Sequence, residues 1–326
     1  MKIIAYAPSR LSFIGGGTDI ESYYKNYGGY VINMAINLRQ RVELYKEDDT
    51  FHLIYNKFPV NGNPELFYKI FENYGVNGHH HVRILSSFDG IIGAGLGSSA
   101  AACVCLIGAL RRSQGLDMDK DMIAEEAYHT EVFDMGWAGG RQDQYAAAYG
   151  GFNQMSFGDG DKIVEVNPFH NGYAENLLPY LLLFYIGGTR ESRKIQKGFE
   201  RLSKKQIKAL DHLKENAEQA FHHIIFNEME DLGYLLHETW QFKKESNKGV
   251  SNSRIDDIYD YALKNGAWGG KIMGAGGAGY MLFMCPPEKR NYLIGKMKEK
   301  HIEQIDFNID YNGLETRIES DDLMQI

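Results

Sequence analysis

The stretch Gly93–Ala102, GAGLGSSAAA, limits the folds open to this chain more than any other segment. Its glycines let a backbone curve closely around a ligand, and the serines and alanines that follow are typical of a helix start. The preceding HVRILSSF has the composition of a β-strand, and Ala100–Arg112 that of an apolar helix. A glycine loop between a strand and a helix N-terminus is a favourable place for an anion.

Two common nucleotide-binding patterns do not fit this loop. A Walker A loop requires a lysine before its Ser or Thr, whereas Gly97 is followed directly by Ser98. The dinucleotide-binding pattern G-x-G-x-x-G requires a third glycine one position later than the one found here. Two interpretations stay open at this point. The loop either holds a triphosphate at the helix N-terminus or is an ordinary strand-to-helix turn with serine caps.

The composition narrows the range of partners. A formal net charge of −8 argues against nucleic-acid binding, because proteins that bind nucleic acids are usually basic. The three cysteines form no CxxC pattern and fit a reducing cytoplasm. No apolar stretch of the sequence has the length of a membrane span. We therefore expect a cytoplasmic protein that binds a small molecule, with no nucleic-acid or membrane partner and with a homodimer left open.

The order of the predicted elements indicates an α+β protein with two domains. KIIAYAP predicts a strand that ends at Pro8, and 64–74 predicts a helix that starts at Pro64. Strands and helices are mixed up to a predicted β-hairpin over 150–168, and 191–246 then carries amphipathic helical patterns. The segment SRIDDIYDYALKNG predicts a further helix that ends before Gly266. A strand, a second glycine loop and a further strand follow over 271–287. We place the boundary after the hairpin, which gives domains at 1–175 and 176–326.

Two further segments decide how the loop is interpreted. They are APSRLSFIGGGTDI at Ala7–Ile20 and KIMGAGGAGY at Lys271–Tyr280. Together with GAGLGSSAA they resemble, in order and spacing, the three motifs of the GHMP kinases, which include galactokinase, homoserine kinase, mevalonate kinase and phosphomevalonate kinase. The resemblance spans nearly the whole chain. It implies an N-terminal domain like domain 2 of ribosomal protein S5, a ferredoxin-like C-terminal domain, ATP and Mg²⁺ as cofactors, and an active site between the domains.

Within the superfamily, the sequence resembles the kinases that phosphorylate the anomeric hydroxyl of a sugar. The segments IGGGTD and GGRQDQYAAAYGGFNQM are similar to those of D-glycero-D-manno-heptose 7-phosphate kinases, and more loosely to those of fucokinases and glucuronokinases. Gly16-Gly17 replaces the Glu-His of galactokinases, which argues against galactose. The resemblance implies conversion of the heptose 7-phosphate to the 1,7-bisphosphate. Fucose, glucuronate or another hexose are the alternative substrates, and a non-catalytic nucleotide or sugar sensor is the alternative of another class.

The resemblance also implies roles for two charged residues. Asp143, in GGRQDQ, would accept or orient the proton of the sugar hydroxyl. Arg10, in PSR, would pair with Asp143 and with the transferring phosphoryl group. The alternatives are an aspartate that binds its own backbone in a turn and a surface salt bridge.

Contacts to ATP and Mg²⁺ follow from the same resemblance. Mg²⁺ would bind Ser99 and Glu131, for which Glu125 and Glu126 are competing carboxylates. The ATP phosphates would contact the first glycine loop at Gly93, Gly95, Leu96, Gly97, Ser98, Ser99 and Ala100. The second loop would support the first one, or it is a β-turn that requires positive φ angles. Its predicted supporting residues are Gly274, Gly276 and Gly277.

The sugar would contact a short turn of the first motif, at Gly16, Gly17, Thr18 and Asp19. The segment TDIESYY also reads as a helix start, so a helix cap is the alternative role of Asp19. A phosphate on the sugar would require a second anion site. Arg190 is the candidate for that site, with a solvated basic helix start as the alternative.

Overall fold

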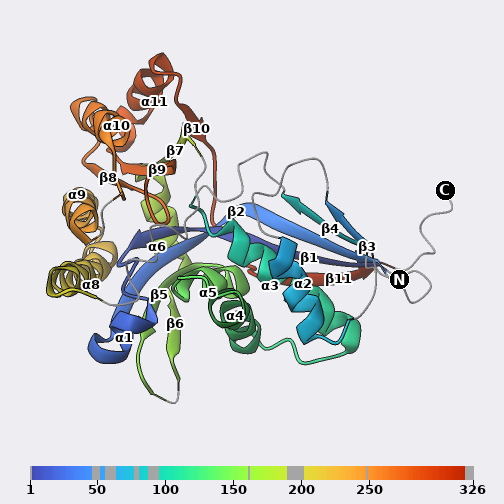
Figure 1. Cartoon of the computed structure of the whole chain (residues 1–326). Helices are drawn as coiled ribbons and strands as arrows, with labels where there is room; N and C mark the ends of the chain where they lie inside the picture. Colours follow the sequence, from blue (N-terminus) through green and yellow to red (C-terminus); the bar gives the residue numbers. More distant parts are fainter. Residues whose placement is uncertain are drawn as a thin grey trace.

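A computed structural model describes residues 2–45, 52–55, 64–76, 81–86, 95–160, 162–188, 202–246 and 249–319. Two groups of strands, each with its own helices, make up the molecule (Figure 1). The elements of the first half are β1 (Lys2–Ile14), α1 (Glu21–Tyr27), β2 (Gly29–Tyr45), β3 (His52–Tyr55), α2 (Pro64–Asn73), β4 (His81–Ser86), α3 (Ser98–Gln114), α4 (Lys120–His129), the π-helical turn η1 (Thr130–Asp134), α5 (Gln142–Tyr149), β5 (Phe152–Phe157) and β6 (Val164–Pro168).

The elements of the second half are α6 (Asn171–Leu177), the 3₁₀ turn η2 (Leu178–Tyr180), β7 (Leu181–Gly187), α8 (Lys204–Ile225), α9 (Met229–Ser246), α10 (Ser253–Lys264), β8 (Gly269–Ile272), β9 (Gly279–Met284), the 3₁₀ turn η4 (Pro287–Lys289), α11 (Arg290–Glu299), β10 (Glu303–Ile305) and β11 (Glu315–Glu319). No helix in the described part of the chain combines the length and the apolar character that a membrane crossing needs.

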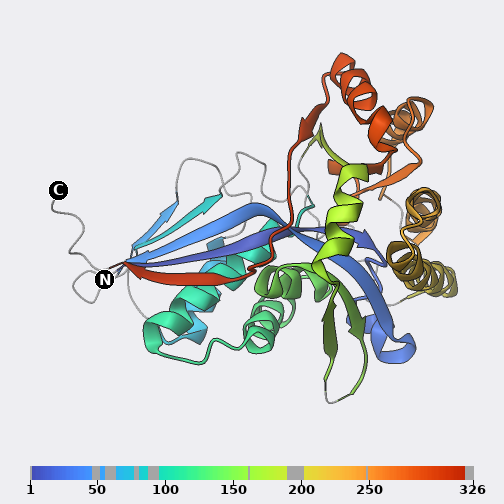
Figure 2. The same cartoon turned by 180° about the vertical axis from the view of Figure 1, so that it is seen from behind.

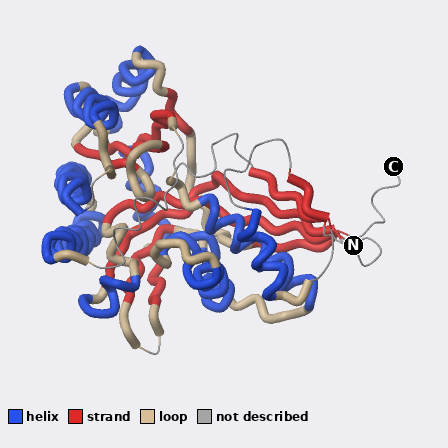
Figure 3. The backbone as a smooth tube through the Cα atoms, viewed as in Figure 1, coloured by secondary structure: helices blue, strands red, loops and turns tan. Residues whose placement is uncertain are grey.

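The first sheet is built around the two long strands β1 and β2. Its order is β11-β1-β2-β4-β3, and β5 pairs with β2 while β6 pairs with β5. The first part of β2, residues 29–34, pairs with β5, and its last part, residues 40–45, pairs with β4. Helices α3 and α5 pack directly on β1 and β2, and α2 and α4 pack against α3 on the same side of the sheet (Figure 3). The buried side chains of these layers form one apolar core.

The second sheet has the order β10-β7-β9-β8 and carries the helices α9, α10 and α11. Helix α8 packs on β1 and β2 of the first sheet and on α9, which in turn packs on β8 of the second sheet. A continuous apolar cluster joins Leu11 and Ile32 of the first sheet with Ala217 of α8 and Met273 beside β8. The α+β architecture predicted from the sequence is confirmed, and its two halves share buried apolar surface.

Strand β1 is longer than the sequence predicted. The pattern KIIAYAP predicted an end at Pro8, but the strand continues to Ile14. Its register against β2 shifts between Pro8 and Ser9 and again between Ser12 and Ile14. Such irregularities let a strand accommodate a proline, which has no N–H to donate. As a result, Arg10 lies on a strand within the sheet and not in a loop.

The C-terminal segment returns to the first sheet. After β10, Asp310 bridges two parts of the N-terminal half, because its N–H donates to the carbonyl of Ala35 and its carbonyl accepts from the N–H of Gly151. Strand β11 then pairs antiparallel with β1 at the edge of the sheet (Figure 2). The division into 1–175 and 176–326 stays a prediction, and a single cut of the chain does not describe this returning strand.

Candidate active site

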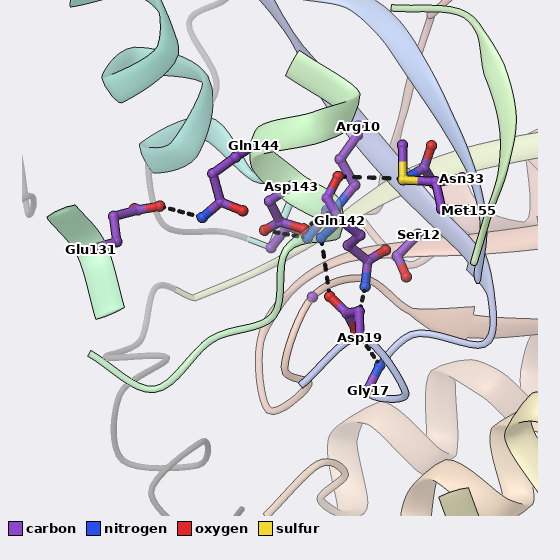
Figure 4. Close-up of polar contacts among 12 residues, drawn as sticks. Arg10, Ser12, Gly17, Asp19, Asn33, Glu131, Gln142, Asp143, Gln144 and Met155 are labelled. Atoms are coloured by element: carbon purple, nitrogen blue, oxygen red, sulfur yellow. Dashed lines mark hydrogen bonds and ion pairs between the residues drawn. The ribbon is translucent and has the colours of Figure 1, made fainter. Parts of the chain in front are cut away.

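The centre of the site is an ion pair between residues 133 positions apart, Arg10 on β1 and Asp143 in the first turn of α5 (Figure 4). Nε of Arg10 donates to Oδ1 of Asp143 at 2.7 Å, and Nη2 donates to Oδ2 at 2.8 Å. The side chain of Arg10 is 5% exposed, whereas that of Asp143 is 28% exposed. The buried guanidinium of Arg10 therefore holds the carboxylate of Asp143, which remains partly accessible to solvent. Neither a turn aspartate bound to its own backbone nor a surface salt bridge describes this pair.

The first glycine loop reaches the same ion pair. Nη1 of Arg10 donates to the carbonyl of Gly95 at 2.8 Å, and the backbone N–H of Arg10 donates to the carbonyl of Leu96 at 2.9 Å. Gly97, which has no side chain, is the N-cap residue of α3 with a φ of 70°, so neither serine occupies the N-cap position. A Cβ on Gly97 would lie 3.3 Å from Oδ2 of Asp143. The N-terminus of α3, which favours negative charge, thus lies beside the ion pair.

The two glycine loops meet back to back. A Cβ on Gly95 would lie 2.6 Å from the carbonyl oxygen of Met273, and a Cβ on Gly274 would lie 2.6 Å from Cα of Gly95. Lys243 of α9 is buried and donates to the carbonyl of Gly274 at 2.6 Å. Because the backbones approach so closely, side chains at Gly95 or Gly274 would push the loops apart.

Gly276 and Gly277 have a different neighbour from Gly274. The N–H of Gly277 donates to the carbonyl of Val250 at 2.7 Å, and a Cβ on Gly276 would lie 2.4 Å from that same carbonyl oxygen. Both glycines also have positive φ angles, 89° and 81°. Of the three predicted supporting residues, Gly274 touches the first loop, whereas Gly276 and Gly277 fix the second loop to the segment before α10.

Ser99 and Glu131 lie next to each other beside the N-terminus of α3. Oγ of Ser99 donates to Oε1 of Glu131 at 3.0 Å, and Nε2 of Gln144 donates to Oε2 at 2.6 Å. Burial raises the pKa of Glu131 to about 7, and the charge of Asp143 adds to the rise, although the two hydrogen bonds act in the opposite direction. Glu131 lies in the π-helical turn η1, a local geometry that is frequent at functional sites.

The two competing carboxylates are paired elsewhere. Glu125 accepts hydrogen bonds from Nε of Arg141 and from the hydroxyl of Tyr145, both at 2.9 Å. Glu126 forms an ion pair with Arg111. Glu131 is therefore the one of these three carboxylates that meets Ser99.

The turn of the first motif is partly buried. Gly16 and Gly17 are partly exposed, but Thr18 is fully buried and its Oγ1 donates to the carbonyl of Gly15 at 2.8 Å. Asp19 is 3% exposed. Ile20, and not Asp19, is the N-cap residue of α1, so the helix-cap alternative does not hold.

The carboxylate of Asp19 accepts three N–H groups. Oδ1 accepts from the backbone of Gly17 at 2.9 Å and from Nε2 of Gln142 at 3.0 Å, and Oδ2 accepts from the backbone of Gln142 at 3.2 Å. Burial raises the pKa of Asp19, and the charge of Asp143 raises it further, while these hydrogen bonds lower it. Gln142 thus connects the first motif with the helix that carries Asp143.

The sequence reasoning missed a buried lysine at this place. Lys271 of β8 is 1% exposed, and its Nζ donates to the carbonyls of Ser12 at 2.5 Å and Phe13 at 3.0 Å. Burial, with the charges of Lys243 and Arg10, lowers its pKa well below the usual value, and the charge of Asp19 opposes this. A lysine directly before the apolar residues Ile272 and Met273, in a predicted strand that leads into the second loop, was the available signal. Gln142 and Gln144, which flank Asp143, were also missed.

Two predicted residues, Gly93 and Arg190, lie outside the described residues. Among the described residues, the structure brings Arg10, Asp143 and the first glycine loop together, with Ser99 and Glu131 beside that loop.

Two family models match the chain. The model described as GHMP kinases N terminal domain matches residues 65–151, and the model described as GHMP kinases C terminal matches residues 209–300. Among curated proteins, the chain is 32% identical over 340 residues to D-glycero-alpha-D-manno-heptose 7-phosphate kinase of Campylobacter jejuni. That match covers 97% of this chain and 99% of the relative.

Solved structures agree on the fold. The crystal structure of a D-glycero-D-manno-heptose 1-phosphate kinase from Bacteroides thetaiotaomicron superposes with a TM-score of 0.77 at 23% identity, covering 98% of this chain and 100% of that one. A putative sugar kinase from Campylobacter jejuni gives a TM-score of 0.75 at 30% identity, and the match covers 97% of this chain and 98% of that one. Lactococcus lactis galactokinase in complex with galactose gives a TM-score of 0.72 at 15% identity, and the match covers 97% of this chain and 95% of that one.

Proposed function

The chain belongs to the GHMP kinase superfamily, and on that premise we propose that it transfers the γ-phosphoryl group of ATP to the anomeric hydroxyl of a sugar, D-glycero-D-manno-heptose 7-phosphate. The observation that carries the proposal is the bidentate Arg10–Asp143 pair, which lies beside the first glycine loop. Phosphoryl transfer needs little covalent chemistry from the protein, but it needs a positioned hydroxyl and compensation of the phosphate charge. The similarity to the Campylobacter jejuni heptose kinase supports the choice of the sugar.

The ATP phosphates are proposed to bind at the first glycine loop and the start of α3. The fit is supported by the positive φ angles of Gly95 and Gly97 and by a glycine at the N-cap position of α3. The backbone N–H groups there can approach phosphate oxygens closely. The proposed contact residues among those described are Gly95, Leu96, Gly97, Ser98, Ser99 and Ala100.

Magnesium is proposed to bind between Ser99 and Glu131. The hydroxyl and carboxylate oxygens of these residues lie 3.0 Å apart, and oxygen ligands of this kind suit Mg²⁺. When bound, the ion would offset negative charge on the phosphates. Gln144 would keep the carboxylate oriented, because it donates to the other oxygen of Glu131.

In the proposed reaction, Asp143 faces the anomeric hydroxyl and accepts or orients its proton. Arg10 holds the carboxylate in place and, together with the N-terminus of α3, stabilises the negative charge of the transferring group. The sugar would lie against the partly exposed backbone of Gly16 and Gly17. Direct contacts from Thr18, Asp19 and Arg190 stay predictions.

Release of ADP over a sugar panel tests the function. With ATP and Mg²⁺, we expect D-glycero-D-manno-heptose 7-phosphate to be the best substrate of a panel that includes the unphosphorylated heptose, L-fucose and D-glucuronate. The unphosphorylated heptose lacks the phosphate and so loses about one charged hydrogen bond to the protein. We expect its kcat/KM to be about 10- to 100-fold lower than that of the 7-phosphate. Equal rates on the two heptoses would point to a free-sugar kinase. ATP binding without turnover on any sugar would support the sensor.

The apparent affinity for Mg²⁺ should depend on pH around neutrality. A metal ligand must lose its proton, and Glu131, with a pKa raised to about 7, is increasingly protonated as the pH falls below that value. We therefore expect the affinity to be constant above pH 8 and to weaken by about tenfold per pH unit below pH 6. Titration of Mg²⁺ against ADP-bound protein from pH 5.5 to 8.5 measures this. Glu131→Gln should bind Mg²⁺ more weakly and lose the pH dependence, whereas an unchanged profile would contradict the assignment.

A further inference from the structure

We infer that two buried lysines of the C-terminal half are positioning residues, each for a different substrate of the proposed reaction. Lys271 holds the end of β1, which leads to the sugar, and Lys243 holds the second glycine loop, which lies against the ATP site. Each acts through the backbone that its ammonium group binds. The inference rests on the proposed function, because it concerns how that site is kept in place.

The side chain of Lys271 links the second sheet to the first. Lys271 lies on β8 and is 1% exposed, and its Nζ donates to the carbonyls of Ser12 at 2.5 Å and Phe13 at 3.0 Å. The register between β1 and β2 shifts at this place, because β1 has one more residue than β2 between Ser12 and Ile14. An extra residue of this kind disrupts the hydrogen bonds of the ladder. The ammonium group therefore binds carbonyl oxygens at a bulge in β1.

This bulge lies between two parts of the proposed site. Arg10, which holds Asp143, precedes the bulge on β1, and the partly exposed backbone of Gly16 and Gly17 follows it. A shift of the bulge changes the distance between a sugar that lies against these glycines and the carboxylate that it faces. Because phosphoryl transfer depends on close alignment of the reacting atoms, such a shift lowers the rate.

Lys243 holds the backbone on the nucleotide side. From α9, its Nζ donates to the carbonyl of Gly274 at 2.6 Å and to that of Ile272 at 3.3 Å. Gly274 is the residue of the second loop that approaches Gly95 of the first loop. Without the lysine, the second loop can move away from the first loop, where the ATP phosphates are proposed to bind.

Two ammonium groups at this place are electrostatically unfavourable. Burial lowers the pKa of Lys271 well below its usual value, and the charges of Lys243 and Arg10 lower it further, although the charge of Asp19 opposes them. The oxygens that Lys271 binds belong to carbonyl groups, which carry only partial charge. Costly arrangements of this kind cluster at functional sites, which supports a role for both lysines in the reaction.

Lys271→Met and Lys243→Met test the inference, because methionine is a flexible side chain that has neither the charge nor the N–H donors. Turnover is measured at saturating ATP with the sugar of the panel that the wild type phosphorylates fastest. Isothermal titration measures the Kd for ATP in the absence of sugar.

For Lys271→Met, we expect kcat/KM for the sugar to fall by about 10- to 100-fold. The Kd for ATP should stay within about threefold of the wild-type value. The reason is that β8 keeps its backbone pairing with β9 and Lys243 still holds the second loop.

For Lys243→Met, we expect the reverse pattern. The Kd for ATP should rise by about tenfold, which corresponds to the loss of one charged hydrogen bond. At saturating ATP, kcat/KM for the sugar should change by less than about threefold. Lys298→Met, at an exposed lysine of α11, is the matched control and should leave both quantities at their wild-type values.

The opposite assignments of the two substrates are the readout that a purely structural role would not give. A general loosening between the two halves would weaken sugar turnover and ATP binding together in each variant, and that result would overturn the inference. An unchanged kcat/KM for the sugar in a folded Lys271→Met protein would overturn it as well.

Thermal melting shows whether each variant folds. If Lys271→Met does not fold, Lys271→Gln replaces it, because the side-chain nitrogen of glutamine ends one bond short of Nζ and carries no charge. The same fall in kcat/KM is expected, and an unchanged value would contradict the inference. Wild-type protein that turns over no sugar of the panel would contradict the proposed function before any variant is compared.

Discussion

Asp143→Asn is expected to reduce turnover by about 10²–10⁴-fold while ATP affinity stays near the wild-type value. The amide has the shape of the carboxylate, but it has little basicity and no charge. It can therefore neither accept the proton of the sugar hydroxyl nor balance the buried guanidinium of Arg10. Steady-state ADP release with saturating heptose 7-phosphate measures the effect, and equilibrium binding of an ATP analogue measures the nucleotide affinity.

Loss of stability is the competing explanation for such a result. Removing one partner of the Arg10–Asp143 pair leaves a charge that is 5% exposed, so a thermal melting curve must accompany the kinetics. Asp257→Asn, an exposed aspartate on α10, is the matched control and should keep wild-type turnover. A well-folded Asp143→Asn protein with near wild-type turnover would remove Asp143 from the mechanism.

Gly95→Val is expected to weaken ATP binding by about 10- to 100-fold. Gly95 has a φ of +102°, and its Cβ would lie 2.6 Å from the carbonyl oxygen of Met273. The added side chain therefore pushes the two glycine loops apart and displaces the carbonyl that accepts from Arg10. Overpacking against a backbone costs about 1–3 kcal/mol, and about 1.4 kcal/mol corresponds to tenfold in affinity. Isothermal titration with ATP and Mg²⁺ measures the loss.

A control variant separates the effect of the collision between the two glycine loops from the effect of a side chain at a positive φ angle. Gly115 has a φ of +68°, and a Cβ at this position would meet nothing within 4 Å, so Gly115→Val carries the backbone strain without the collision. It should lower the melting temperature but leave ATP affinity unchanged. If Gly95→Val bound ATP as tightly as Gly115→Val does, the first glycine loop would not be the phosphate site.

Local structure followed from the sequence where the signal lies within a few residues. The glycine loop before α3, the helix that starts at Pro64 and the helix that ends before Gly266 are all present. These features depend on side-chain periodicity and on glycine or proline at element ends, which act within one turn or one strand pair. The same local signals predicted that β1 ends at Pro8. They contain no information on the irregular pairing with β2 through which the strand continues to Ile14.

The sequence by itself determined the family, the α+β class and the pairing partners Arg10 and Asp143, because three motifs in fixed order carry that information. Only the tertiary structure decided what Asp19 and Lys271 do. Both are buried charges whose partners lie far along the chain, Gln142 for Asp19 and the carbonyls of Ser12 and Phe13 for Lys271. A buried charge must find partners in whatever packs around it, and the packing of distant segments is not written in the residues next to it.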